Sequence, residues 1–542
     1  MALRGVFNAL AVAGALIGCS SASTDPPASD PYGDPAAVQA RLAQTLDDLA
    51  QLGEKRAGTE AGRQAGDYLR DRFEAAGLND VGFESFSFLG YEVSASSFAV
   101  EVDGAPLAME HGVFAYSGAG NVAAEVVDVG VGRESDYAGV DAAGKVVLVT
   151  RDPVFHRSSQ YRLVIDQGGV AMLYVSQAPD NLVQIGTVAD PEDGMGPIPS
   201  VTVGTDDGDA IADALADGLT VTATIDVDAS VLPAQGRNVV GQLPGATPDA
   251  PYLLLGAHYD TWYVGSADNT TGVAALVEIA EASAHHAGRT FGLRFVAYDG
   301  EELGLFGGYD YLRDHVVVDE EPMLAFLNFE MPAAGEQGLR VMASSAVGPM
   351  DAALTDAGLT ELYTMYVGLE LIPALFGGVI PTDIQGAYWH GVQGMITACD
   401  SPYYHTTEDT PEKIDVPFLA EAVLGFERAL AALDRAPAVD FSERDPAVWS
   451  VEATTANAAD GLDVTVAVTD AAGVAQGNAV VRVRVDVDDF TRTFDETTVA
   501  DGDGQVTVNV PATALAAGSG ERWLHVTAGD GYPLAERVLP LP

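Results

Sequence analysis

The sequence contains few cysteines and few basic residues. Its 542 residues include two cysteines, Cys19 and Cys399, so no disulfide framework supports the fold, and we expect Cys399 to be a small buried core residue. Lysine and arginine together number 26 against 79 aspartates and glutamates, which gives a formal net charge of −53. A surface this acidic repels nucleic acid phosphates and anionic lipid headgroups, and we therefore expect no nucleic acid partner.

The N-terminal apolar stretch, Val6–Ile17, is too short for a comfortable membrane span. It follows the basic Arg4 and ends in Leu16-Ile17-Gly18-Cys19, which resembles the lipobox of bacterial lipoproteins. The resemblance predicts an export signal over residues 1–19, with Cys19 carrying a lipid that anchors the protein to the bacterial cell envelope. A simple signal peptide and a secreted protein are the alternative. Contact with a membrane is expected only through this anchor.

Changes of composition divide the rest of the chain. Residues 20–35 are rich in Ser, Asp and Pro and predict a flexible linker. Helical apolar periods and alternating strands and helices over 36–111 and 231–436 predict one α/β domain, with a mixed, mostly parallel sheet flanked by helices. Between them, 112–230 shows short strands, one helix and many turns. The final segment, 437–542, has several alternating strands and predicts an antiparallel β-sandwich.

Acidic side chains follow three apolar runs that predict buried strands. The runs are YLLL at 252–255, LRFVAY at 293–298 and MLAFLN at 323–328. The residues that follow them are His258, Asp260 and Asp268 after the first, Glu301 and Glu302 after the second, and Glu330 after the third. Either Asp268 or Asn269 is placed to cap the next helix. Ligands bind at the carboxyl ends of parallel strands, so we expect these side chains to form a site.

Taken singly, a capping aspartate or a glutamate pair at a helix start has a structural explanation. Together, four carboxylates in one crevice repel one another unless a cation holds them. A second histidine, His405, lies in a later loop. Because two imidazoles and carboxylate oxygens form a suitable shell for zinc, the combination indicates a metal site.

The same motifs resemble those of the cocatalytic-zinc aminopeptidase family, which also includes glutamate carboxypeptidases, dipeptidases and glutaminyl cyclases. They are residues 256–272, Glu301–Gly304, Asn328–Met331 and Tyr404–Thr406. Residues 112–230 resemble the protease-associated domain that many members carry as an insertion. The resemblance covers residues 36–435 and implies the zinc aminopeptidase fold with two zinc ions per chain.

The resemblance also implies a ligand set. His258 would bind the first zinc and Asp268 would bridge both, while Glu302 and His405 would bind the second, and Glu330 would complete the set. Glu330 departs from the family, which usually shows aspartate here. Its extra methylene moves the carboxylate by about one carbon–carbon bond, which bears on the occupancy and identity of the first metal.

Three further residues receive roles from the resemblance. Asp260 would accept the other imidazole N–H of His258, Glu301 would be the general base, and Tyr404 would donate a hydrogen bond to the developing oxyanion. Asp383 occupies the place of a family Ser-Asp motif, but the residues that usually follow are missing, so we consider it only as an outer contact of the site.

These observations predict an exported zinc exopeptidase that hydrolyses peptides with metal-activated water, foremost an aminopeptidase. A dipeptidase or carboxypeptidase would need a cation for the substrate carboxylate. One alternative is a glutaminyl cyclase-like aminoacyltransferase, against which the retained His258 and the inserted segment argue. Another is a catalytically impaired binding protein. The sequence predicts no particular oligomeric state.

Overall fold

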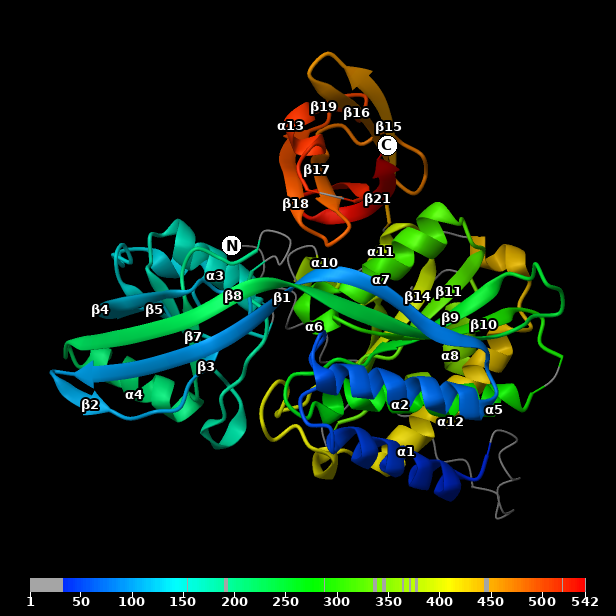
Figure 1. Ribbon diagram of the computed structural model, residues 1–542, viewed down its shortest axis with the longest axis horizontal. Coiled ribbons are helices and arrows are strands. Elements are labelled where there is room, and N and C mark those ends of the chain that lie inside the picture. Colours follow the sequence, from blue (N-terminus) through cyan, green and yellow to red (C-terminus); the bar gives the residue numbers. More distant parts are fainter. Residues whose placement is uncertain are drawn as a thin grey trace, which may run out of the picture.

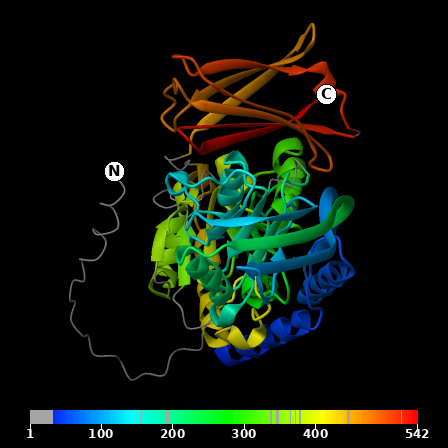
Figure 2. The same cartoon turned by 90° about the vertical axis from the view of Figure 1, so that its left-hand side faces the viewer.

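The computed structural model describes residues 33–153, 155–189, 194–286, 288–334, 339–343, 348–362, 365–369, 372–375, 379–442, 448–518 and 520–541. The predicted export signal with Cys19 lies outside these residues. The described chain forms two lobes side by side and a third domain above them (Figures 1 and 2). In the part of the chain described here, no helix combines the length and apolar character needed to cross a membrane.

The first lobe contains the predicted mixed sheet. Its strands are β9 (Tyr252–His258), β10 (Gly292–Tyr298), β11 (Met323–Asn328), β12 (Leu339–Ala343), β13 (Met365–Gly368) and β14 (Gln393–Cys399). Strand β9 lies between β10 and β11 and is parallel to both, and β11 is parallel to β14. Strand β9 is buried along its whole length, as its apolar sequence predicts, and Cys399 is buried at the end of β14.

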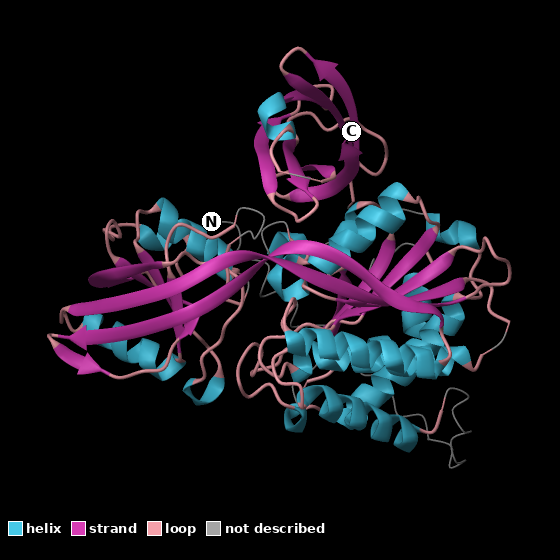
Figure 3. Cartoon of the chain, in the orientation of Figure 1, coloured by secondary structure: helices cyan, strands magenta, loops and turns pink. Residues whose placement is uncertain are grey.

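Helices cover both faces of this sheet (Figure 3). The helices of the lobe are α1 (Pro35–Ala50), α2 (Glu60–Ala76), α5 (Thr271–Ala284), α7 (Phe306–Tyr311), α8 (Met350–Asp356), α9 (Leu359–Leu362), α10 (Ile372–Leu375), α11 (Gln385–Trp389) and α12 (Val416–Leu433). Leu253 and Leu255 pack into the core with α1, α2, α5 and α12. Tyr252 and Leu254 point to the opposite face and pack with α11. This two-sided burial explains the unbroken apolar run in β9.

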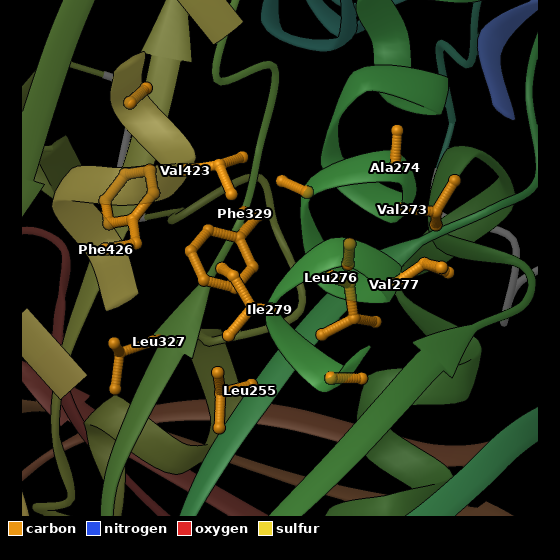
Figure 4. Packing of buried hydrophobic residues seen from close by; sticks show 14 of the residues in the cluster. Leu255, Val273, Ala274, Leu276, Val277, Ile279, Leu327, Phe329, Val423 and Phe426 are labelled. Carbon is orange, nitrogen blue, oxygen red and sulfur yellow. The ribbon is translucent and has the colours of Figure 1, made fainter. Parts of the chain in front are cut away.

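Packing at the end of β11 holds the chain beside Glu330. Figure 4 shows Phe329 among Ile279 of α5 and Val423 and Phe426 of α12. The rings of Phe329 and Phe426 meet edge to face with centroids 5.0 Å apart. An aromatic pair in this arrangement adds about 0.5–1.5 kcal/mol beyond its buried area. The position of Glu330 is therefore fixed by the core directly behind it.

Two long strands connect the lobes. Strand β1 (Asn79–Val102) pairs antiparallel with β8 (Val221–Leu243) over nearly its whole length, and together they join both lobes into one 14-stranded sheet. The second lobe adds β2 (Ala105–Leu107), β3 (Gly112–Val113), β4 (Gly120–Asp128), β5 (Val146–Thr150), β6 (Ala171–Val175), β7 (Ser200–Val203), α3 (Arg157–Asp166) and α4 (Thr205–Ala216). Strands β4 to β7 are parallel neighbours.

The second lobe has two helices where the sequence predicted one. Helix α3 was missed because a glutamine, Gln160, occupies a buried position on it and weakens the apolar period. The Gln160 side chain donates hydrogen bonds to the carbonyls of Val131 and Thr150 at 2.7 and 2.9 Å. A polar residue thus satisfies loop carbonyls from inside the core.

The C-terminal segment forms two antiparallel sheets with one core between them, as predicted. Its elements are β15 (Ser450–Ala458), β16 (Gly461–Thr469), β17 (Val480–Val487), β18 (Arg492–Val499), β19 (Gln505–Pro511), β20 (Arg522–Gly529), β21 (Pro533–Leu541) and the short helix α13 (Ala512–Leu515). The sandwich contacts the α/β lobe closely. Tyr309 donates to Glu536 at 2.9 Å, and the rings of Phe306 and Phe490 lie 5.0 Å apart.

Candidate metal centre

Three neighbouring strands end at one edge of the sheet, and each end carries an imidazole or a carboxylate. Strand β9 ends at His258, β10 leads into α6 (Glu301–Gly304), and β11 ends two residues before Glu330. Gly300 makes the turn into α6 with φ at +76°, a left-handed conformation that glycine adopts without strain. Because the strands are parallel neighbours, their three ends meet, as the sequence pattern predicts.

Asp268 lies between two histidines. Its Oδ1 is 3.2 Å from Nε2 of His258, and its Oδ2 is 3.0 Å from Nε2 of His405. It belongs to the turn Ser266–Thr270 before α5, where the neighbouring Asn269, rather than Asp268, accepts a backbone N–H of the helix at 3.1 Å. Asp268 is therefore left to face both imidazoles, in the position of a bridging ligand.

Two more carboxylates complete the group. Glu330 Oε1 lies 3.2 Å from Nε2 of His258, and Glu302 Oε2 lies 3.0 Å from Nε2 of His405. One ligand atom from each of His258, Asp268 and Glu330 lies within 4.8 Å of the others, and the same holds for Asp268, Glu302 and His405. The structure thus assembles two three-residue groups that share Asp268. The longer side chain of Glu330 reaches its histidine at the same distance as Asp268 does.

Both histidines present Nε2 to the carboxylates because their other nitrogen is occupied. Nδ1 of His258 lies 3.0 Å from the backbone carbonyl of Asp260, and Nδ1 of His405 lies 2.9 Å from the backbone carbonyl of Ile185. A carbonyl oxygen only accepts, so each Nδ1 carries the proton of the bond. Each Nε2 is thereby oriented as a ligand atom.

Asp260 acts differently from the expectation. Its backbone carbonyl, rather than its carboxylate, makes the shorter contact with His258, since the carboxylate oxygen is 3.6 Å away. The carboxylate instead accepts the backbone N–H groups of Glu301 at 3.1 Å and Glu302 at 3.3 Å. Asp260 therefore joins the first loop to the start of α6.

Glu301 and Tyr404 lie beside the two groups. Glu301 Oε2 is 3.8 Å from Nε2 of His258, and its side chain is 11% exposed. The ring of Tyr404 stacks on that of His405 with centroids 3.7 Å apart. Burial raises the pKa of Tyr404, so its hydroxyl remains protonated and able to donate.

Several contacts of the site were not foreseen. Asp409 accepts the backbone N–H groups of Ala267 and Asp268 at 2.8 and 3.2 Å. Asp409 stands four residues after His405, and this proximity was the one signal for it in the sequence. Around Glu330, the hydroxyl of Thr382 donates to its carboxylate at 3.3 Å, and Thr397 donates to its carbonyl at 2.7 Å. Asp383 is buried, but it lies outside both three-residue groups, and its neighbour Thr382 makes the contact.

The electrostatics of the cluster match a cationic occupant. Burial raises the pKa of Glu302 to about 7, and burial together with the charges of neighbouring carboxylates raises the pKa of Glu301 well above its ordinary value. Burial would lower the pKa of His405, but Glu302 and Asp268 raise it to about 9. Among the described residues, Oε1 of Glu302 is buried without a hydrogen-bond donor. Two imidazoles and buried carboxylates with spare oxygens are a donor set that fits zinc.

A cavity of about 480 Å³ opens beside these residues, and all three domains line it. Glu301, Glu302 and Tyr404 come from the α/β domain, Arg157 from the start of α3, and Arg484 from the sandwich. The sandwich is therefore a wall of the space next to the site.

Comparison with known proteins confirms the resemblance seen in the motifs. Residues 238–426 match the model of peptidase family M28, and residues 117–211 match that of the PA domain. The chain is 27% identical over 388 residues to a probable glutamate carboxypeptidase from Zea mays, covering 57% of this chain and 54% of that protein. It is 28% identical over 327 residues to an aminopeptidase from Pseudomonas aeruginosa, covering 56% and 59%. The chain thus spans little more than half the length of these curated relatives.

The fold is that of solved zinc aminopeptidases. A zinc aminopeptidase from Bacillus subtilis superposes with a TM-score of 0.56 at 18% identity, covering 76% of this chain and 98% of that one. At this identity the likeness shows the fold alone, and it agrees with the fold class predicted from the sequence.

Proposed function

We propose, on the premise that residues 238–426 form a peptidase family M28 domain, that this chain is a zinc-dependent exopeptidase with two zinc ions. The observation that carries the proposal is the position of Asp268 between His258 and His405, with a further carboxylate beside each histidine. Zinc bound there would act as a Lewis acid and lower the pKa of a water molecule toward neutrality.

The roles of the protein's own groups follow from their positions. Glu301 borders the ligands, is partly exposed and lines the cavity, so its carboxylate can take a proton from the attacking water and pass it to the leaving amine. Tyr404 faces the same cavity with a protonated hydroxyl, which can donate to the oxygen that gains charge at the scissile carbonyl. Asp260 holds the first residues of α6 and thus the direction of Glu301.

We propose an aminopeptidase as the first choice among exopeptidases. Glu301 and Glu330 lie close to the ligand histidines and provide negative charge for the free ammonium of a peptide. One observation favours a second candidate. Arg157 lines the same cavity, and its guanidinium is the cation that a dipeptidase or carboxypeptidase needs for the substrate carboxylate. The relative from Zea mays bears the name of a carboxypeptidase.

We further propose that the protein is exported and anchored through Cys19. The sequence Leu16-Ile17-Gly18-Cys19 after a short apolar stretch supports this. In a bacterial host, Cys19→Ala should abolish labelling with a radioactive fatty acid and release or misprocess the precursor. Unchanged lipid labelling of the variant would refute the anchor.

The test of the catalytic proposal measures metal and activity together. Bound metal per chain is counted by mass spectrometry, and hydrolysis is followed for aminoacyl, dipeptidyl, C-terminally acidic and N-terminal glutaminyl substrates. Two zinc ions with aminoacyl release support the aminopeptidase, and loss of a C-terminal residue supports the carboxypeptidase. Cyclisation of the glutaminyl substrate without hydrolysis would favour an aminoacyltransferase, and no reaction with any substrate would favour a binding protein.

A further inference from the structure

A segment of the inserted domain contacts the second ligand pair directly. Four hydrogen bonds run between Gln184–Thr187 and the loops that carry Glu302 and His405. Some 220 residues separate the partners along the chain. The contact is therefore a product of how the inserted lobe folds back onto the metal centre.

The central contact is a reciprocal pair. Nδ1 of His405 donates to the carbonyl of Ile185 at 2.9 Å, and the backbone N–H of Ile185 donates to the carbonyl of His405 at 3.1 Å. The first bond fixes which imidazole nitrogen faces Asp268 and Glu302. The second fixes the backbone of the histidine.

Two side chains of the segment hold the neighbouring carbonyls. The buried amide of Gln184 donates to the carbonyl of Tyr404 at 2.9 Å. The hydroxyl of Thr187 donates to the carbonyl of Glu302 at 2.8 Å. Both ligands of the second pair are thus positioned from the inserted lobe.

The conformation of His405 gives an independent reason for this support. Its φ is +58°, in the left-handed region that non-glycine residues adopt at a cost of about 1–3 kcal/mol. Such a conformation persists where surrounding contacts determine it. The bonds from Ile185 and Gln184 bracket this residue and provide those contacts.

The supporting segment is itself anchored within its lobe. Ala115 donates to the carbonyl of Gly186 at 2.8 Å, and Arg157 Nε donates to the carbonyl of Thr187 at 2.8 Å. A Cβ on Gly186 would lie 2.6 Å from the Arg157 guanidinium, so the close approach requires glycine. The segment is therefore a braced part of the lobe and can transmit its position.

The first ligand pair has no such dependence in the contacts described above. The partners of His258 and Glu330 there are Asp260, Thr382 and Thr397, all from the α/β domain. The two halves of the metal centre are therefore supported by different lobes.

We propose that the inserted domain is a structural part of the second metal site and sets the affinity of the Glu302–His405 pair for its zinc, with Gln184 and Thr187 as positioning residues. This inference rests on the proposed two-zinc function. It predicts that the lobe does more than restrict access to the cavity. Any ligand or change that shifts the segment would change occupancy of the second site alone.

The test uses zinc-buffer titration of the full chain, which does not depend on turnover. The double variant Gln184→Leu/Thr187→Val should bind one of two zinc ions about 10- to 100-fold more weakly, the usual effect of losing outer partners of metal ligands. Thr187→Ser keeps the hydroxyl and should restore the Thr187 contribution. Thr397→Val is the matched control, since it removes the corresponding bond to the Glu330 carbonyl and should weaken the other zinc.

Single-site backgrounds identify which zinc is affected. In Glu330→Ala, which leaves the second pair intact, the double variant should weaken the remaining zinc, whereas in His405→Ala, which leaves the first pair intact, it should have no effect. Unchanged affinity at the second site, or equal loss at both sites, would overturn the inference. A wild-type chain that binds fewer than two zinc ions would instead count against the proposed function.

Discussion

The carboxylate of Asp260 accepts the backbone N–H of Glu301 at 3.1 Å, and this bond links the loop after β9 to the helix after β10. The other oxygen of the same carboxylate accepts the N–H of Glu302 at 3.3 Å. One buried acid thus orients the residue proposed as base and a ligand of the second zinc, while its carbonyl orients His258.

Asp260→Asn should weaken this arrangement without removing volume. An amide accepts with only one of its two terminal atoms, so one of the two N–H groups at the start of α6 loses its acceptor. We expect zinc affinity or kcat to fall about 10- to 100-fold. Zinc titration and steady-state kinetics check this, and wild-type values for both would show that the carboxylate bonds do not contribute.

Glu301→Gln should stop turnover and leave metal content intact. The amide cannot take a proton from water, and loss of a general base costs about 10²- to 10⁴-fold in rate. The measurement is kcat alongside zinc per chain. If zinc is lost as well, Glu301 is a ligand and its proposed role is wrong.

Glu330→Asp should weaken the first zinc site in this chain. The backbone at Glu330 is fixed by Phe329 packing and by Thr397, so the shorter side chain withdraws from His258 and from the Thr382 hydroxyl. We expect about a tenfold or greater loss of affinity for one zinc. Unchanged or tighter binding of both ions would mean that the backbone moves to compensate.

Tyr404→Phe tests the hydroxyl alone, because the phenylalanine ring can keep its stacking on His405. If the hydroxyl donates only to the oxygen that gains charge in the reaction, kcat should fall about 100-fold with KM unchanged. A rise in KM at constant kcat would indicate that Tyr404 binds substrate instead. Wild-type kinetics would assign it to packing.

Glu536→Gln tests the contact between the sandwich and the α/β lobe. Burial would raise the pKa of Glu536, but the hydrogen bond from His525 and the charges of His525 and Arg484 lower it to about 2. Below pH 4.5 the unfolded chain takes up a proton that the folded chain refuses. The resulting stabilisation, about 3 kcal/mol, is complete above that pH and is lost as pH falls toward 2.

The melting temperatures of wild type and Glu536→Gln should therefore differ at pH 7 and converge as pH falls from 4.5 toward 2. Glu496→Gln, at an exposed position on β18, is the matched control and should melt like wild type throughout. A gap between wild type and Glu536→Gln that stays constant with pH would contradict this assignment.

The sequence predicts the ligand edge well because its signals are local. An apolar run followed by His258 or Glu302 contains both the buried strand and the exposed end. The supports of the site are less visible. Ile185 contributes only backbone atoms, so nothing in its side chain indicates the contact with His405. Asp409 reads as one more acidic loop residue until the fold places it under Asp268.

The docking of the sandwich could not be predicted for a related reason. Alternation in β17 and β21 identifies the residues of the inner core, and the remaining positions read as solvent-facing. Glu536 and Asp486 are nevertheless buried, because they face Tyr309 and Arg313 of another domain. A partner surface of that kind has no signature within the strand itself.

The continuous pairing of β1 with β8 limits how these lobes can be exchanged between proteins. A chimera joined at the apparent boundaries near 112 and 230 would cut a ladder whose registers run from Asn79 to Val102, and would leave two mismatched ribbon halves. The register shift between Val93 and Ala95, opposite Ala229 and Asp228, is the one irregularity in the middle of that ladder. A graft that carries both strands as one unit and splices there keeps each half with its own partner, so the inserted lobe is exchangeable only together with its shared strands.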